Sequence, residues 1–389
     1  MLDRSLPNNV VVVHANETPP ESWAGSVFLA GPLPRADNAV SWHPAAIRSL
    51  REQWQGEGTL VVFSPEPRGG LESDYDGQIA WEERFLNIAD VILFWVPRDL
   101  ATMPAFTTNI EWGVWHRSGK AVVGAPEDAP GNTYLFRQAD ARGVPSAFTL
   151  DGTVAHALDQ IGPGALRSGG EREIPLLVWR NESLQRWTTA QREAGNTLLG
   201  ARVEWTFRVG PAKAVHYWAL HVSVHVAAED RVKDNEVVLS RPDLAVAVLY
   251  RPAPELDDTV VVLVREFRSS ASTADGFVRE PPGGSGPGPV DAAQALAEVE
   301  EETGLVLTAD RLRPLGSRQV AATVSAHHAL LFAAAITDAE LEGLRAVPGP
   351  HGVGGGEVTW VEIATFGEIR KGARVDWATL GMITQALSA

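Results

Sequence analysis

Four short and almost uninterrupted apolar runs, separated by helical stretches, constrain the fold of residues 25–160. The runs are Val27–Ala30, Leu60–Phe63, Val91–Val96 and Ala121–Gly124. Strands that are apolar on both sides are typical of a parallel sheet whose faces are covered by helices. Helical candidates at residues 43–54, 78–89 and 107–118 alternate with these runs. We therefore predict an α/β domain with a parallel sheet over residues 1–161.

Each run ends in a turn that contains glycine or proline, and the first such turn is Gly31-Pro32. Ligands of open α/β sheets bind outside the carboxyl ends of the strands. We therefore expect substrate-binding residues at these turns, with Gly31 and Pro32 among them.

Regular periodicity lapses between residues 162 and 173, which read Gly-Pro-Gly-Ala-Leu-Arg-Ser-Gly-Gly-Glu-Arg-Glu. This composition is typical of a linker, so residues 162–177 are predicted to separate two domains. Farther along the chain, apolar and polar residues alternate with period 2, over residues 202–208, 214–226, 244–250 and 259–266. That pattern indicates antiparallel strands. Residues 178–389, which also contain helical stretches, are predicted to form an α+β domain.

The charge balance bears on the partners of the protein. The chain has 389 residues, of which 49 are acidic and 33 basic, for a net charge of −16. An acidic surface repels nucleic acid and anionic membranes, so we expect a small-molecule ligand, no nucleic acid and no membrane. No apolar run approaches the roughly 20 residues of a membrane span. Because the chain also lacks cysteine and a secretion signal, we expect a cytoplasmic protein.

Three glutamates recur at helical spacing near the middle of the second domain. Glu298, Glu301 and Glu302 stand at positions i, i+3 and i+4 of a predicted helix over residues 290–303, so they share one face. Clustered carboxylates repel one another unless a cation neutralises them, and hard oxygen ligands suit Mg²⁺ or Mn²⁺. The alternative interpretation is a solvated acidic helix end. Gly304 is the type of residue that ends a helix in a left-handed conformation.

The wider spacing around these glutamates resembles the Nudix box, G-x5-E-x7-R-E-U-x-E-E-x-G-U. The matching residues are Gly283, Glu298, Val299, Glu301, Glu302, Gly304 and Leu305. Two positions depart from the pattern, because Pro289 replaces a glutamate and Ala297 replaces the arginine. In the family that arginine braces the catalytic glutamate, so its loss puts efficient turnover in doubt.

The Nudix resemblance implies a fold, an activity and a set of site residues for the second domain. It implies a Nudix fold that hydrolyses a nucleoside diphosphate derivative, such as an ADP-ribose-like molecule or a nucleotide sugar. Magnesium or manganese would be held by Glu298, Glu301 and Glu302, of which the last two are also catalytic. The segment Arg265-Glu-Phe-Arg268 is similar to one in the ADP-sugar pyrophosphatases. That similarity implies that Arg265 and Arg268 line the substrate pocket and that the domain forms a homodimer.

Two carboxylates stand out in the first domain. Glu82 interrupts the apolar stripe of the helix that leads into residues 91–96, so it requires a partner or a function. Glu111 lies at the start of the next helix. Thr108-x-x-Glu111 has the form of a capping box, which explains that glutamate without any chemistry. We expect Asp90, at the junction between helix and strand, to be structural.

Several segments of the first domain together resemble the nucleoside 2-deoxyribosyltransferase-like family. They are Leu29-Ala-Gly-Pro32, the Trp81-Glu82 helix that ends in Ala-Asp90, and Asn109-Ile-Glu-Trp-Gly113. The resemblance implies a flavodoxin-like fold and cleavage of the N-glycosidic bonds of nucleosides or nucleotides. It implies that Glu111 is the nucleophile, that Glu82 acts as acid and base, and that Asn109 binds substrate. Trp81 is a candidate substrate-binding residue that could stack on a base, but core packing is the default interpretation for an aromatic residue beside apolar runs.

The two halves together predict a bifunctional nucleotide-processing enzyme. The second domain would split a nucleoside diphosphate derivative, and the first would cleave or transfer the N-glycosidic bond of a nucleoside or nucleotide. The alternative is a nucleotide-sensing regulatory protein with a degenerate Nudix domain, which the changes at Pro289 and Ala297 keep open.

Overall fold

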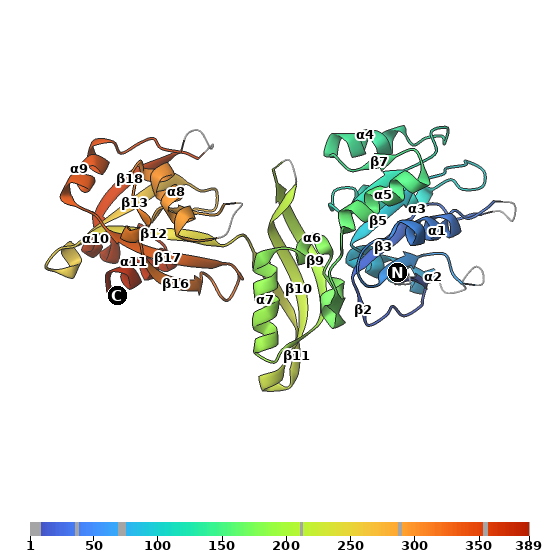
Figure 1. Ribbon diagram of the computed structural model, residues 1–389, viewed down its shortest axis with the longest axis horizontal. Coiled ribbons are helices and arrows are strands. Elements are labelled where there is room, and N and C mark those ends of the chain that lie inside the picture. The colour runs from blue at the N-terminus through green and yellow to red at the C-terminus, as the bar shows by residue number, and fades with distance from the viewer. Residues whose placement is uncertain are drawn as a thin grey trace, which may run out of the picture. The chain divides into compact units, whose positions relative to one another are not determined.

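The computed structural model describes residues 9–35, 39–68, 75–210, 213–286, 290–352 and 357–388. The chain forms two compact units, Met1–Val238 and Leu239–Ala389 (Figure 1). The division between these units falls about 60 residues beyond the predicted linker at residues 162–177.

Unit 1 contains a six-stranded parallel sheet whose strand order is β1-β4-β3-β5-β6-β7. These strands are β1 (Val10–His14), β3 (Gly25–Ala30), β4 (Leu60–Ser64), β5 (Val91–Trp95), β6 (Ala121–Gly124) and β7 (Ser146–Ala147). Strand β1 extends one edge, and the remaining five strands have the flavodoxin-like order 2-1-3-4-5. The predicted parallel α/β sheet is therefore confirmed.

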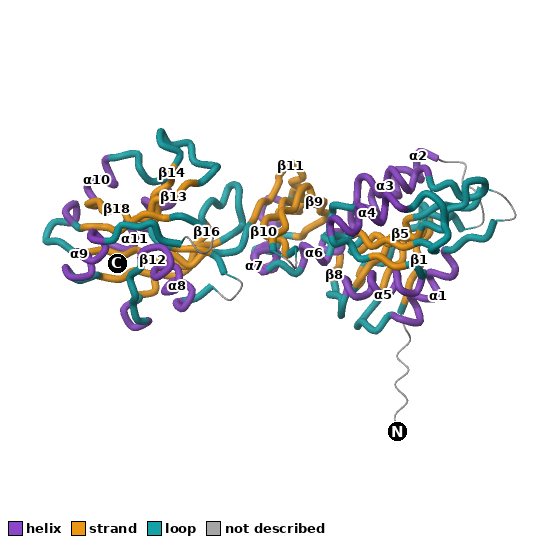
Figure 2. The backbone as a smooth tube through the Cα atoms, turned by 90° about the horizontal axis from the view of Figure 1, so that it is seen from above, coloured by secondary structure: helices purple, strands orange, loops and turns teal. Residues whose placement is uncertain are grey.

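Helices cover both faces of this sheet (Figure 2). One face packs against α2 (Tyr75–Ile88), α3 (Phe106–Trp115) and α4 (Thr133–Arg142), which contribute Phe85, Trp112 and Leu135 to its core. On the other face α5 (Leu150–Ile161) packs on β5 and β6 and contacts α1 (His43–Gln53). Burial of both sheet faces is the reason that the strand sequences are apolar without interruption.

The predicted linker over residues 162–177 is wrong, because this segment is folded into unit 1. It contains β8 (Arg167–Ser168), which pairs with β2 (Ser22–Trp23), and it continues as η1 (Gly169–Glu173) and α6 (Leu176–Trp179). Gly162, Gly164 and Gly169 all adopt positive φ. The glycines therefore serve tight turns of a packed segment and do not mark a mobile one.

Arg167 connects this segment to the parallel sheet. Its fully buried guanidinium forms two 2.7 Å hydrogen bonds with the carboxylate of Asp90, and the backbone N–H of Leu176 donates to the same carboxylate. Ser26 also donates its hydroxyl hydrogen to Asp90. Asp90 is therefore structural, as predicted, and two of its partners come from residues that were predicted to lie outside the domain.

The remainder of unit 1 is a three-stranded sheet with the order β11-β10-β9. Its strands are β9 (Thr197–Val209), β10 (Ala214–Val226) and β11 (Arg231–Ser240), and the pair β9–β10 is antiparallel, as predicted. Helix α7 (Glu182–Glu193) is linked to β10 by a hydrogen bond from the Trp218 indole to the Ser183 hydroxyl. These residues were predicted to belong to the second domain, but β9 makes extensive contacts with η1 of unit 1.

Unit 2 is built on a mixed sheet with the order β14-β13-β12-β17-β16, to which β15 and β18 pair at β12 and β13. The strands are β12 (Leu244–Arg251), β13 (Val260–Phe267), β14 (Phe277–Glu280), β15 (Gly283–Gly284), β16 (Arg313–Gln319), β17 (His328–Ala335) and β18 (Thr359–Thr365). The pair β12–β13 is antiparallel, as the period-2 pattern predicted, whereas β12–β17 is parallel.

Helices also pack on both faces of this second sheet. One face contacts α8 (Ala292–Thr303) and α9 (Asp338–Ala346), and the other contacts α10 (Phe366–Lys371) and α11 (Trp377–Ser388). Three short 3₁₀ turns complete the described elements, η2 (Ala227–Glu229), η3 (Leu256–Asp258) and η4 (Ala309–Arg311). Among the described residues of the chain, every helix is too short or too polar to cross a membrane.

Candidate active sites

The carboxyl ends of the strands in unit 1 carry the turns that the sequence predicted. Gly31 and Pro32 follow β3, and the Trp42 indole donates a 3.1 Å hydrogen bond to the Pro32 carbonyl. A Cβ at Gly31 would lie 2.3 Å from the carbonyl oxygen of Trp95, so only glycine fits at this point. The chain therefore passes close to the end of β5 here.

A buried histidine beside the same edge was not predicted from the sequence. His43 is only 1% exposed, and its Nδ1 lies 2.9 Å from the Ser64 hydroxyl at the end of β4. Burial lowers the pKa of His43 to about 3, so the imidazole is neutral. Its Nε2 has no hydrogen-bond partner among the described residues. A histidine at the start of a helix carries no distinctive sequence signal.

Glu82 on α2 and Glu111 on α3 are half-buried and close enough for their charges to interact. Burial raises the pKa of Glu111 to about 7, and the charge of Glu82 acts in the same direction. Burial also raises the pKa of Glu82, while Gln78 opposes this by donating a 2.8 Å hydrogen bond to its carboxylate. The structure thus brings together the two carboxylates that were singled out in the sequence.

The capping-box interpretation of Glu111 is wrong. Helix α3 begins at Phe106, after Ala105 in a left-handed conformation with φ 60° and ψ 38°, and it has no side-chain cap. Thr108 is therefore inside the helix, where its side chain is buried. Capping boxes do form in unit 2, at Thr337 and Thr365. Capping does not explain the presence of Glu111.

Asn109 is held in place by a buried arginine that was likewise not predicted. The Arg98 guanidinium donates hydrogen bonds to Asn109 Oδ1 at 2.8 Å, to the Pro104 carbonyl at 2.8 Å and to Asn132 Oδ1 at 3.2 Å. Arg98 follows β5, so it fixes the loop before α3 against the end of the sheet. The position of this arginine, directly after Val-Pro at the end of a strand, was the only feature of the sequence that could have indicated its role.

Trp81 packs in the core, which is the default interpretation of this residue, and it does not present an aromatic face for base stacking. It is 8% exposed and packs against the rings of Phe28, Phe63 and Phe85. The side chain lies in the core because α2 buries this side of the helix on the sheet.

Unit 1 therefore combines a flavodoxin-like sheet with a pair of interacting carboxylates on α2 and α3. Residues 24–129 match the profile of the family described as nucleoside 2-deoxyribosyltransferase like. The match spans Gly31, Glu82, Asn109 and Glu111, and it supports a nucleoside transferase or glycosidase type of function for the N-terminal part of the chain. A search of curated proteins found no match.

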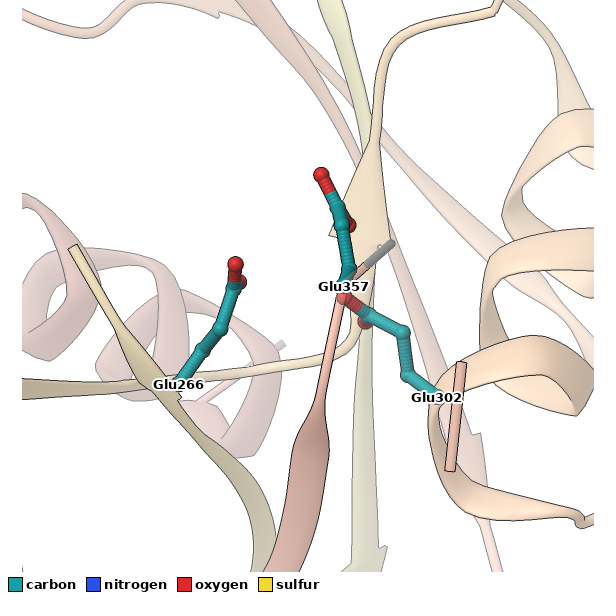
Figure 3. Close-up of side chains that lie close together, drawn as sticks. All are labelled: Glu266, Glu302 and Glu357. Carbon is teal, nitrogen blue, oxygen red and sulfur yellow. The ribbon is translucent and has the colours of Figure 1, made fainter. Parts of the chain in front are cut away.

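Unit 2 contains a second cluster of carboxylates (Figure 3). Glu266 on β13, Glu302 on α8 and Glu357 ahead of β18 each offer an oxygen atom, and these atoms lie within 4.8 Å of one another. Burial raises the pKa of Glu302 to about 9 and that of Glu266 to about 7. Glu266 was not predicted, because only the fold brings it to the helix.

Two glycines shape the approach to this cluster. The backbone N–H of Gly283 donates a 2.9 Å hydrogen bond to Glu302. A Cβ at Gly283 would lie 2.6 Å from the Ala245 carbonyl oxygen, and one at Gly284 would lie 2.6 Å from the Glu298 carboxylate. Gly283 requires glycine because this contact is with the backbone, which accounts for the glycine of the sequence pattern, whereas the Glu298 side chain can move away from a Cβ at residue 284.

The three glutamates predicted on α8 have different surroundings. Glu302 is buried, Glu298 is half-buried with a charge that raises the pKa of Glu302, and Glu301 is exposed outside the cluster. The spacing i, i+3 and i+4 spreads side chains over part of the helix circumference, and Glu301 lies at its solvent side. Gly304 ends α8 in the left-handed conformation, as predicted. Pro289 lies outside the described residues.

The two arginines predicted to line one pocket lie on different sides of the sheet. Arg268 contacts Glu266 at 2.7 Å, Glu280 at 3.7 Å and Glu357 at 3.8 Å. Arg265 instead stacks over the rings of Phe277 and Trp360. Side chains alternate along β13, so Arg265 and Glu266 point to opposite faces. Only Arg268 therefore belongs to the carboxylate cluster.

The donor set of this cluster fits a hard divalent cation. Three carboxylates converge, and Glu298 and Glu280 add negative charge at its edge. Arg268 supplies a single positive charge against them. Carboxylate oxygens are the ligands that Mg²⁺ and Mn²⁺ prefer, and an uncompensated group of buried carboxylates is costly.

Proposed function

We propose that unit 1 cleaves the N-glycosidic bond of a nucleoside or nucleotide, with Glu111 as nucleophile and Glu82 as acid and base. The observation that supports this proposal is the pair of interacting, half-buried carboxylates within the segment that matches the family. Burial of both groups is the environment in which carboxylates acquire the separate protonation states that glycosidic chemistry requires.

In the proposed reaction the ionised Glu111 attacks the anomeric carbon while the bond to the base nitrogen breaks. The electron pair of that bond leaves with the base, which takes a proton from Glu82. Water then attacks the glycosyl-enzyme and gives its proton to Glu82, which restores both groups. A second base in place of water would give transfer. Asn109, fixed through its oxygen by Arg98, has its amide N–H groups left to bind the sugar.

The test is release of free base by the full chain from a panel of nucleosides and nucleoside monophosphates, measured by chromatography. We expect the Glu111→Gln variant to lose activity by about a thousandfold or more, because glutamine cannot act as the nucleophile. Glu83→Gln is the matched control, since Glu83 is exposed on α2 next to Glu82. Activity that persists in Glu111→Gln would exclude the assigned role.

We further propose that unit 2 is a Nudix hydrolase that acts on a nucleoside diphosphate derivative, with ADP-ribose-like molecules or nucleotide sugars preferred. The supporting observation is the cluster of Glu266, Glu302 and Glu357, formed by a glycine-rich segment and the following helix. A mixed sheet between two layers of helices is compatible with this proposal. We also propose that the protein self-associates through unit 2.

Glu266, Glu302 and Glu298 would hold Mg²⁺ or Mn²⁺. The cation supplies Lewis acidity at the phosphoryl group. Glu357 is exposed and adjacent to this set, and we assign it the role of taking a proton from the attacking water. Arg268 would contact phosphate oxygens, since its guanidinium already lies among the carboxylates.

Product analysis over a panel of nucleotide sugars and ADP-ribose, with Mg²⁺ and with EDTA, tests this assignment. We expect a nucleoside monophosphate as product with the metal and none with EDTA. Ligand binding without any product in the presence of Mg²⁺ would instead favour the sensor alternative. Ala297 on the exposed side of α8 is the feature that supports that second function, because the residue cannot brace a glutamate.

A further inference from the structure

A cavity of about 970 Å³ lies at the edge of the unit 1 sheet that is opposite the candidate active site. Asp90, Ala121 and Pro145 line it, and each stands at or just before the start of a parallel strand. The candidate active site lies at the opposite end of this sheet, where β3, β4 and β5 end. The cavity is therefore a separate location, and a ligand bound in it would be independent of the proposed function.

The lining of this cavity is strongly basic. It includes Arg117, Arg142, Arg180, Arg208 and Lys213, which belong to or adjoin five different elements. Asp90 is the single acidic residue of the lining, and its carboxylate is already bonded to Arg167. In a chain of net charge −16, such a group of cations is unusual.

These five cations make no ion pairs with carboxylates in the part of the chain that the structure describes. Arg208 donates a 2.8 Å hydrogen bond to the Arg117 carbonyl, and Arg180 donates a 3.2 Å bond to the Gln160 carbonyl. Burial lowers the pKa of Arg208. A guanidinium that is partly desolvated without a counter-charge is stabilised by a bound anion.

A buried histidine provides an independent indication of a ligand. His116 lines the cavity and is 5% exposed, and its Nδ1 lies 2.7 Å from the Trp112 carbonyl oxygen. A carbonyl can only accept, so Nδ1 carries a hydrogen, and in the neutral form of the ring Nε2 is an acceptor. Nε2 has no partner among the described residues. A ligand that carries a hydroxyl beside its anionic groups would satisfy it.

We propose that this cavity is a second ligand site of unit 1, which binds a small molecule with two or more phosphate groups. Planar guanidinium groups match phosphate oxygens in pairs, which is why arginine predominates at phosphate sites. The volume is that of a pocket for a nucleotide-sized ligand. The acidic remainder of the chain disfavours a nucleic acid polymer at the same place.

Isothermal titration of the full chain with inorganic pyrophosphate and with ADP tests the proposal. The titrations are made in metal-free buffer on the Glu302→Gln background, so that unit 2 does not contribute. We expect the double variant Arg142→Ser/Arg208→Ser to bind both probes about tenfold more weakly or worse. The matched control is Arg137→Ser, because Arg137 is exposed on the same helix as Arg142 and outside the cavity.

The proposal is overturned if neither probe binds at concentrations up to about 5 mM, or if the double variant and the control bind equally. Circular dichroism establishes whether the double variant is folded. If it is not, Arg117→Ser/Lys213→Ser takes its place under the same criterion. Arg117 is exposed and neither side chain has a hydrogen bond within the described residues, so this substitution leaves the packing intact.

Discussion

Glu111 has a pKa of about 7, which gives the proposed reaction of unit 1 a defined pH dependence. The nucleophile Glu111 acts in its ionised form and the acid Glu82 in its protonated form, so the rate of base release is expected to rise as the pH approaches about 7 and to fall again at higher pH, where Glu82 is ionised. Below the pKa the rate should fall about tenfold for each pH unit. A kcat/KM profile from pH 5 to 9 measures this, and a rate that is highest at pH 5 would make Glu111 the acid.

The same shift predicts how Glu111 affects stability. Its pKa in the folded protein lies above its ordinary value of 4.5. The contribution of the protonated Glu111 to the free energy of unfolding is therefore fully present below pH 4.5, and it is lost as the pH rises through about 7. Glutamine keeps the shape without the charge. We expect Glu111→Gln and the wild type to melt at the same temperature at pH 4, and the variant to melt higher at pH 8.

Glu301 and Glu302 are neighbours on α8 whose substitutions should have opposite outcomes. Glu302 is 4% exposed and belongs to the carboxylate cluster, whereas Glu301 is exposed outside it. We expect Glu302→Gln to abolish both pyrophosphate cleavage and the rise in melting temperature caused by Mg²⁺. Glu301→Gln should keep both. Loss of both properties in the Glu301→Gln variant alone would contradict the assigned ligand set.

At the scale of elements, the start of α3 depends on Arg98. This buried side chain satisfies three acceptors, among them Asn109 and the carbonyl of Pro104. Arg98→Met would leave these acceptors unpaired and is expected to lower the free energy of unfolding by about 2–3 kcal/mol. It should also raise KM for the nucleoside more than it lowers kcat, since Asn109 loses its anchor. Chemical denaturation and steady-state kinetics measure the two effects, with Arg137→Met as control.

The sequence allowed the elements to be predicted better than their contacts. The apolar runs correspond to β3, β4, β5 and β6, and α8 ends at Gly304, because burial on both faces and a left-handed cap leave local signals. The capping box at Thr108 failed because the left-handed Ala105 starts the helix earlier. Glu266 was not predicted because it joins Glu302 only through the pairing of distant strands.

The size of the independently folding N-terminal part follows from Asp90 and Arg167. A fragment of residues 1–161 would leave Asp90 buried without its guanidinium partner, whereas residues 1–238 retain the pair. Removing one member of a buried ion pair costs about 3–5 kcal/mol. We expect the shorter fragment to melt at a much lower temperature than the longer one, as measured by circular dichroism. Equal melting temperatures would show that the segment after residue 161 is dispensable.

The position of the division between units was beyond what the composition could indicate. The sequence around Gly162 and Gly164 is typical of a linker, but each of these glycines adopts a positive φ in a packed turn. Glycine is common both in mobile linkers and in tight turns, so a high glycine content does not distinguish a linker from a packed turn. The contacts of Arg167, which has no local sequence pattern, are what extend unit 1.

The separation of Asp90 and Arg167 along the chain also delays the formation of their ion pair during translation. Asp90 and Arg167 are separated by 77 residues, so the carboxylate is made long before its partner. At translation rates of roughly 5–20 residues per second, this delay is about 4–15 s. Limited proteolysis of ribosome-bound chains should find the region protected only once Arg167 has emerged. We therefore expect the segment that matches the family by sequence to reach its full stability on the ribosome only after Arg167 has emerged.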